Sequence, residues 1–178
     1  MAEPARLSAQ WIHNRHQELS LNELARYPHL AATYSRWQEI GEGHIPRDLG
    51  PFDVPRSLLP YVMKLDLEGD GCDPVNTRLR VRLAGTEVCM KHGGEMRGKT
   101  TDDFFSADDA KAVVESALQV IRTGRPSLAR RDYISLDDRR WGYVRLILPL
   151  SRAGDGVDSF FKVLDPETLH ERGPVAVW

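Results

Sequence analysis

The chain has 178 residues, of which 41% are hydrophobic and 28% are charged, and its formal net charge at pH 7 is −2. This length is typical of one domain, and the composition is too apolar for a disordered chain. The near-neutral charge argues against a general nucleic-acid binder, although a local basic patch stays open. The 2 cysteines, Cys72 and Cys89, indicate no disulfide framework, although a single bridge stays open, and residues 1–10 carry no apolar run. We therefore expect a soluble, cytoplasmic protein with reduced thiols.

The N-terminal part predicts a polar segment and then a helix. Residues 1–20 are polar and either helical or mobile, and Ser20 and Glu23 have the spacing of a capping box. A helix is predicted over residues 21–43, which Pro28 either kinks or divides. Its apolar face is formed by Leu30, Tyr34, Trp37 and Ile40. This stripe must be buried, either on the chain's own sheet or on the same helix of a second subunit.

The region after this helix predicts an extended strap and two strands. Four prolines between residues 46 and 60 exclude long regular structure. Residues 61–67 alternate as a strand does, and a loop rich in turn-forming residues follows. In the next strand, residues 78–83, leucine and valine alternate with Arg78, Arg80 and Arg82. The alternation predicts one buried face and one face that carries three guanidinium groups.

The remaining chain predicts short helices, one long helix and three strands. Glycines break residues 86–105 into short helical pieces, and Ser106 and Gly124 mark the ends of a longer amphipathic helix. Strands are predicted at residues 127–136, 141–150 and 157–164, and a tail at residues 166–178. Two strands, a helical crossing and three antiparallel strands form an α+β pattern with a single sheet.

Several short motifs resemble one family in their order and spacing. Residues 34–37 (YSRW), 45–47 (IPR) and 51–60 (PFDVPRSLLP) resemble the lead-in of the PAS_5 family of bacterial, mostly alphaproteobacterial, PAS domains. The segment RVRLAGT at residues 80–86 is similar to that family's strand-end signature, and GKT at residues 98–100 to its next landmark. The resemblance covers residues 21–165, with the domain proper at residues 44–165.

The resemblance implies a PAS fold, in which short helices and one long helix cover one face of a five-stranded antiparallel sheet, with an N-terminal helix added. It also implies a signalling, sensory or protein-interaction role, in many members with a small ligand in the core and a homodimer formed through the N-terminal helix. In this chain such a ligand would be lined by residues that otherwise form ordinary core, namely Leu83, Phe104, Val113, Ala117, Tyr133 and Leu146.

The sequence signals for catalytic or cofactor chemistry are weak. His92 lies where haem-binding and flavin-binding PAS domains place key residues, but a lone histidine in a glycine-bounded turn is usually a surface or capping residue. His13 and His16 would share one helical face, without a third ligand at a recognised metal-site spacing. The charged run at residues 137–140 is typical of a hairpin turn. The chain contains no nucleophile elbow, P-loop, dinucleotide fingerprint or zinc-protease motif.

Three functional hypotheses follow. We favour a signalling or interaction module without enzymatic activity, metal or known cofactor, which binds a protein partner or itself. The alternatives are a haem protein, another cofactor protein or a small enzyme on the same scaffold, and a nucleic-acid binder that uses the arginine row. For that row we favour pairing with acidic side chains of neighbouring elements over binding of an anionic partner.

Overall fold

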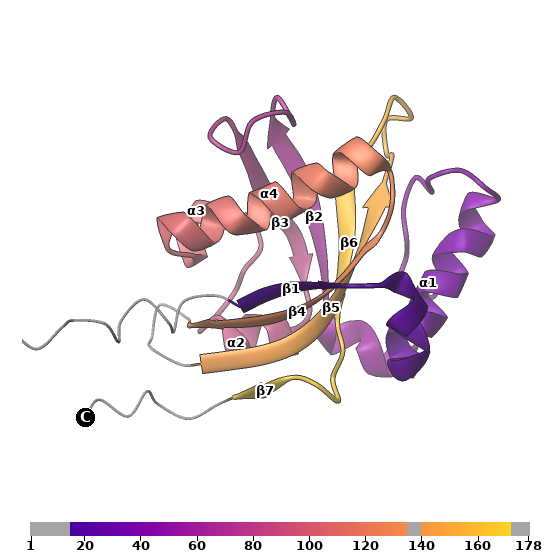
Figure 1. The fold of residues 1–178 in the computed structure, drawn as a ribbon, viewed down its shortest axis with the longest axis horizontal. Coiled ribbons are helices and arrows are strands. Elements are labelled where there is room, and N and C mark those ends of the chain that lie inside the picture. The colour runs from indigo at the N-terminus through magenta and orange to yellow at the C-terminus, as the bar shows by residue number, and fades with distance from the viewer. Residues whose placement is uncertain (1–14, 135–139, 172–178) are drawn as a thin grey trace, which may run out of the picture.

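A computed structural model describes residues 15–134 and 140–171 of the chain. Its centre is one antiparallel sheet whose strands follow the order β1-β4-β5-β6-β2-β3, with β7 paired to β5 (Figure 1). The strands are β1 (Arg15–Leu19), β2 (Val62–Gly69), β3 (Thr77–Ala84), β4 (Ser127–Ile134), β5 (Arg140–Leu150), β6 (Ser159–Leu164) and β7 (His170–Glu171). The five central strands are those that the sequence predicts, which confirms the α+β class and the PAS-type order.

The helices also follow the prediction, with one division. They are the 3-10 helix η1 (Leu21–Arg26), α1 (Pro28–Gly41), the 3-10 helix η2 (Arg56–Tyr61), α2 (Thr86–Lys91), α3 (Thr101–Phe104) and α4 (Ala107–Thr123). Ser106 caps α4 through the backbone N–H of Asp109, and Gly124 ends it in the left-handed conformation. The helix expected over residues 21–43 is divided, because Pro28 opens α1 at its first turn and ends η1 before it.

Both faces of the sheet are covered. Helices α2, α3 and α4 lie on one face, which we call the α4 face, and α1, η1 and η2 lie on the other, which we call the α1 face (Figure 1). Because side chains alternate along a strand, β5 sends Tyr143, Arg145 and Ile147 to the α4 face. The residues between them, such as Leu146, point to the α1 face.

The apolar stripe of α1 packs on the chain's own sheet. Leu30 is fully buried and Trp37 is 8% exposed, both in the cluster that covers the α1 face, while Tyr34 and Ile40 are partly buried against that cluster. The indole N–H of Trp37 donates a hydrogen bond to the backbone oxygen of Pro149 at 2.9 Å. The stripe is therefore not a free surface. Leu30 and Trp37 therefore face the chain's own sheet, and a contact of this helix with a second subunit stays a prediction.

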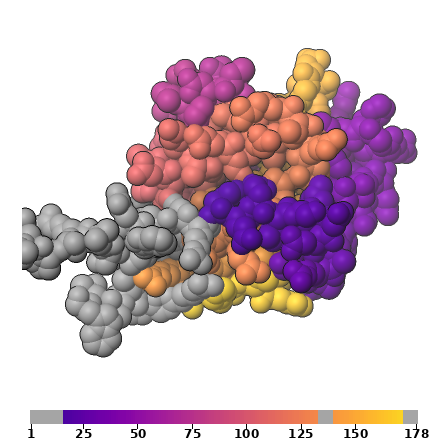
Figure 2. Space-filling model, in the orientation of Figure 1, coloured from indigo at the N-terminus to yellow at the C-terminus, as the bar shows by residue number. Residues whose placement is uncertain are grey.

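Two strands lie outside the expected five. Residues 15–19 were expected to belong to a polar segment that is either helical or mobile, but they form β1, which pairs antiparallel with β4 and is the edge strand on that side of the sheet. Figure 2 shows this N-terminal segment lying across the molecule below α4. His16 lies in an extended strand, so it shares no helical face, and its Nε2 atom is 2.7 Å from the Oε1 atom of Glu18. His13 lies outside the described residues. In the predicted tail, β7 adds two residues beside the start of β5.

A β-bulge in the pair of β2 and β3 changes the predicted alternation. Lys64 is opposite Leu83 and Leu65 is opposite Val81, so Arg82 is the extra residue. Beyond the bulge the strand reverses its faces, because one inserted residue shifts a period of two. Leu79 and Val81 are buried on the α4 face, whereas Leu83 is 44% exposed.

The glycine of the segment at residues 80–86 has a steric reason. The backbone N–H of Gly85 donates to the oxygen of Val62 at 2.8 Å. A Cβ atom on Gly85 would lie 2.3 Å from the backbone oxygens of both Leu59 and Pro60. Only glycine fits this close approach of β3 to η2.

Candidate functional site

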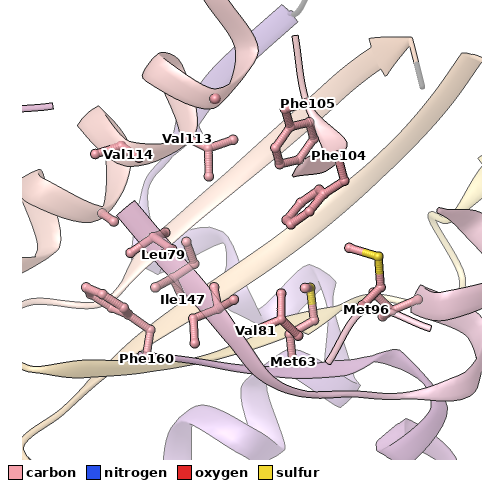
Figure 3. Close-up of a cluster of buried hydrophobic side chains, with 14 of the residues drawn as sticks. Met63, Leu79, Val81, Met96, Phe104, Phe105, Val113, Val114, Ile147 and Phe160 are labelled. Atoms are coloured by element: carbon pink, nitrogen blue, oxygen red, sulfur yellow. The ribbon is translucent and has the colours of Figure 1, made fainter. Parts of the chain in front are cut away.

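Three of the six predicted ligand-lining residues meet in the core of the α4 face. Phe104, Val113 and Ala117 are at most 7% exposed and belong to one apolar cluster. In Figure 3, Phe104 and Val113 project from the helices toward Leu79, Val81, Ile147 and Phe160 of the sheet. This part of the interior is an apolar core.

The other three predicted residues lie elsewhere. Leu146 is fully buried, but on the α1 face, where it packs with residues such as Leu30. Leu83 is turned outward by the bulge and lines a surface groove. The side chain of Tyr133 lies outside the described residues. The placement of Leu83 and Leu146 inside a single pocket is therefore wrong.

The fold buries three basic side chains on the α4 face that were not predicted from the sequence. Arg131 of β4 is opposite Tyr143 of β5, and Lys162 of β6 lies between Met63 and Ile147. Lys91 comes from the last turn of α2. The exposed fractions are 2% for Arg131, 7% for Lys162 and 2% for Lys91. We call these three residues the basic cluster.

Aromatic rings border the basic cluster. The Nζ atoms of Lys91 and Lys162 lie 4.1 Å and 5.7 Å from the centroid of the Tyr143 ring. The guanidinium carbon of Arg131 lies 5.7 Å from the ring centroid of Phe105. The faces of aromatic rings attract cations, so these contacts offset part of the cost of burial.

Burial sets the protonation of the cluster. Burial lowers the pKa of both Lys91 and Lys162 well below the ordinary lysine value, and the positive charge of Arg131 lowers both pKa values further. Burial also raises the pKa of Tyr143. No acidic group is among the causes of the shift in the pKa of Lys162. Arg131 and Lys162 are thus basic groups that repel each other in a poorly solvated place.

A fourth buried cation, Arg145, has its partners in the fold. It donates hydrogen bonds to the backbone oxygen and hydroxyl of Ser127 at 3.1 and 2.8 Å, and to the hydroxyl of Ser116 at 2.7 Å. The carboxylate of Glu18, delivered by β1, lies 3.7 Å away. Burial lowers the pKa of Arg145 to about 10, and the charge of Glu18 acts against this shift. The fold thus provides this buried structural cation with hydrogen-bond acceptors and an acidic partner.

Arg131 and Lys162 lack such partners among the described residues. No described carboxylate lies within 4.0 Å of either, and the Nε and Nη2 atoms of Arg131 are buried without a hydrogen-bond acceptor in the described part of the chain. Asp109 of α4 is buried and its charge raises the pKa of Tyr143, yet it forms no ion pair with a described cation. Arg131 and Lys162 therefore lack an anionic partner among the described residues, and a bound anion would supply one.

His92 lies beside this cluster and caps the C-terminus of α2. Its ring packs edge-on against Phe104 and Phe105, with centroid distances of 5.2 and 5.9 Å. Burial and the neighbouring cations, Lys91 first among them, lower the pKa of His92 from 6.5 to about 2. The capping role expected of this residue is present, and the ring is neutral at physiological pH.

The arginine row is paired with acidic neighbours. Arg78 contacts Asp102, and Arg80 contacts Glu68. Arg82 lies 3.3 Å from Asp66 and 3.6 Å from Asp48. This pairing is the arrangement favoured from the sequence, and it leaves the row little charge for an anionic partner.

A hollow of about 510 Å³ opens on the surface beside the edge strand β3. We call it the β3 groove; its lining includes Pro51, Leu59, Pro60, Lys64, Leu83 and Thr86. Phe52, next to Pro51 in the chain, is 90% exposed. Exposed apolar side chains around a hollow are typical of contact sites for other molecules.

Other candidate chemistry gains no support in the described ranges 15–134 and 140–171. There, no group of three or more histidine, cysteine or acidic side chains could hold a metal ion, and no helix is long and apolar enough to cross a membrane. Cys72 and Cys89 are both free. Of the charged run at residues 137–140, all but Arg140 lies outside the described residues.

One signal in the sequence could have revealed the basic cluster. Residues 159–164 (SFFKVL) form a strand buried on both faces, so a lysine in its middle must be buried as well. Arg131 and Lys91 carry no such signal, because polar and apolar residues are mixed around both of them in the sequence.

The comparisons with known proteins give one match. A family model described as a PAS domain, PAS_5, matches residues 26–165. No curated protein and no solved structure matches the chain.

Proposed function

The chain belongs to the PAS_5 family of PAS domains, and from this premise we propose that it is a cytoplasmic sensory module that binds a small molecule beside the basic cluster and signals to a protein partner. It has no reaction of its own in this proposal. PAS domains serve generally as sensory, signalling or interaction modules, and many enclose a ligand between the sheet and the helices.

One observation carries the ligand-binding part of the proposal. The α4 face of the sheet holds Arg131 and Lys162 where a purely structural core would hold apolar side chains. Buried charges are rare in proteins unless they are paired, and strongly perturbed basic groups gather at functional sites. Two nitrogens of Arg131 are buried without a hydrogen-bond acceptor in the described part of the chain, and no acidic group is among the causes that act on the pKa of Lys162.

Native mass spectrometry tests this proposal. We expect protein purified from its own host to carry an excess mass of one small molecule, which is lost on denaturation. The chain refolded from denaturant and never exposed to host extract is the control. An unmodified mass in every preparation, together with no response to host metabolites, would contradict ligand sensing.

The β3 groove supports the partner-binding part of the proposal, because Leu83 lines it and is 44% exposed, and Phe52 follows the lining residue Pro51 in the chain and is exposed as well. We expect Leu83→Glu to abolish capture of the partner and to leave the melting temperature within a few degrees, since surface changes cost little. The matched control is Val75→Glu, because Val75 is 72% exposed and does not line the groove.

Capture from host extract measures the effect. A protein that is retained by wild type and Val75→Glu but lost with Leu83→Glu supports the groove as the contact. Equal capture by all three would refute it. Light scattering then decides whether the partner is a second copy of the chain, as the expected homodimer requires.

A further inference from the structure

We propose that Arg131 and Lys162, joined by Lys91, bind an oxyanion: the carboxylate or phosphate group of a small ligand held against Tyr143 on the α4 face. This inference rests on the proposed ligand-binding function and adds the chemistry of the ligand.

The buried charge of Arg131 calls for an anion. Arginine keeps its proton even when it is buried, so Arg131 cannot become neutral to avoid the loss of water. A buried cation needs a counter-charge and acceptors for its N–H groups. Arg145 has both, in Glu18 and the two serine hydroxyls, whereas two nitrogens of Arg131 have no acceptor among the described residues. An incoming anion would supply both.

The basic side chains converge from different elements. The three basic side chains come from α2, β4 and β6 and surround the ring of Tyr143 and the neighbouring ring of Phe105. A guanidinium group offers a planar fork that matches the two oxygens of a carboxylate or phosphate, and an ammonium group adds a point charge. Three separate elements thus bring complementary donors to one place.

No described acidic residue forms an ion pair with Arg131 or Lys162. Asp109 is a buried acid whose charge reaches Tyr143. It makes no ion pair with a described residue, and it is absent from the causes that act on the pKa of Lys162. The contacts with Tyr143 and Phe105 attract the cations without supplying a charge. The positive charges of Arg131 and Lys162 are therefore left for a ligand.

The surroundings favour an organic anion. Phe104 and Phe105 lie at the same end of the core, and Trp141 lies 5.8 Å from the Nζ atom of Lys91. Apolar walls with a few polar groups are typical of sites for small organic ligands. A carboxylate with an aromatic body fits this chemistry, and inorganic phosphate tests the head group alone.

Thermal unfolding of the full chain tests the proposal with four probes at matched ionic strength: sodium benzoate, sodium acetate, inorganic phosphate and the neutral benzyl alcohol. We expect benzoate or phosphate at millimolar concentration to raise the melting temperature by about 3–8 °C, and benzyl alcohol to leave it unchanged. The anion that raises the melting temperature more, benzoate or phosphate, identifies the head group. Equal shifts with benzoate and benzyl alcohol, or no shift with any anion, would overturn the proposal.

Two variants locate the effect. Lys162→Met should weaken anion binding at least tenfold and leave the ligand-free melting temperature equal or higher, because it removes a buried charge. Arg130→Met is the matched control, since Arg130 lies on the same strand as Arg131 but is exposed on the opposite face. Lys162→Gln serves if the methionine variant does not fold. Wild-type anion affinity in a folded Lys162 variant would overturn the proposal.

Calorimetry of the wild type gives an independent readout. An anion raises the pKa of the lysines that it touches, so binding should take up protons, and the heat should change with the ionisation enthalpy of the buffer. Binding without proton uptake would contradict a role for Lys91 and Lys162. A bound neutral molecule in native mass spectrometry would refute the anion chemistry and leave the sensory function standing.

Discussion

Trp37→Ala should lower the free energy of unfolding by about 3–5 kcal/mol, as the loss of a large buried aromatic side chain does. Trp37 is 8% exposed and packs between α1 and the α1 face of the sheet. The change also removes the hydrogen bond to Pro149 and leaves a buried backbone oxygen without that donor. Equilibrium denaturation in urea, with the midpoint and slope both fitted, measures the effect.

The control for this prediction is Ser35→Ala, because Ser35 is exposed on the opposite side of the same helix. Its change should lie within about 0.5 kcal/mol of wild type. A Trp37 variant with unchanged stability that instead turned a dimer into a monomer would show that α1 packs on a second subunit. The experiment therefore separates the two burial modes that the sequence left open for this helix.

Acidification should destabilise the protein before its carboxylates titrate. The pKa of His92 falls from 6.5 in the unfolded chain to about 2 in the fold, so the unfolded state binds the proton first. This contribution to stability is complete above pH 6.5 and is lost as the pH falls below that value. Between pH 6.5 and pH 5 the loss should be about 1–2 kcal/mol, since His92 keeps some contact with water.

Denaturation curves at pH 7, 6 and 5 measure this loss, with His92→Leu as the variant that removes the titrating group. The groups that face His92 and act on its pKa are Lys91, Lys162, Lys99 and Arg131, all of them basic. We expect the variant to flatten the curve between pH 7 and pH 5. An equal slope in wild type and variant would assign the acid sensitivity to other groups.

The fold was predictable because its strongest signals are local. The α4 helix carries its start and stop signals, Ser106 and Gly124, and β2 and β3 alternate clearly enough to be placed. The two faces of β5 were not predictable, because Leu146, Ile147 and Leu148 are all apolar and a period of two cannot assign them.

The site was harder to predict than the fold, for two physical reasons. The bulge at Arg82 depends on how β2 and β3 pair and moves Leu83 to the surface. The basic cluster joins residues from three elements that lie far apart in the chain, so only the folded sheet brings Lys91, Arg131 and Lys162 together. Composition alone shows these residues as ordinary surface charges.

The strand β1 has a consequence for how fragments of the chain are cut. A fragment limited to residues 26–165, the range of the family match, lacks both β1 and β7. It would leave the backbone of β4 open as a template for other strands and would strip Glu18 from the buried Arg145. Insoluble or self-associating fragments would then report a missing edge strand, and we expect a fragment that begins at Arg15 to stay soluble where one that begins at residue 26 does not.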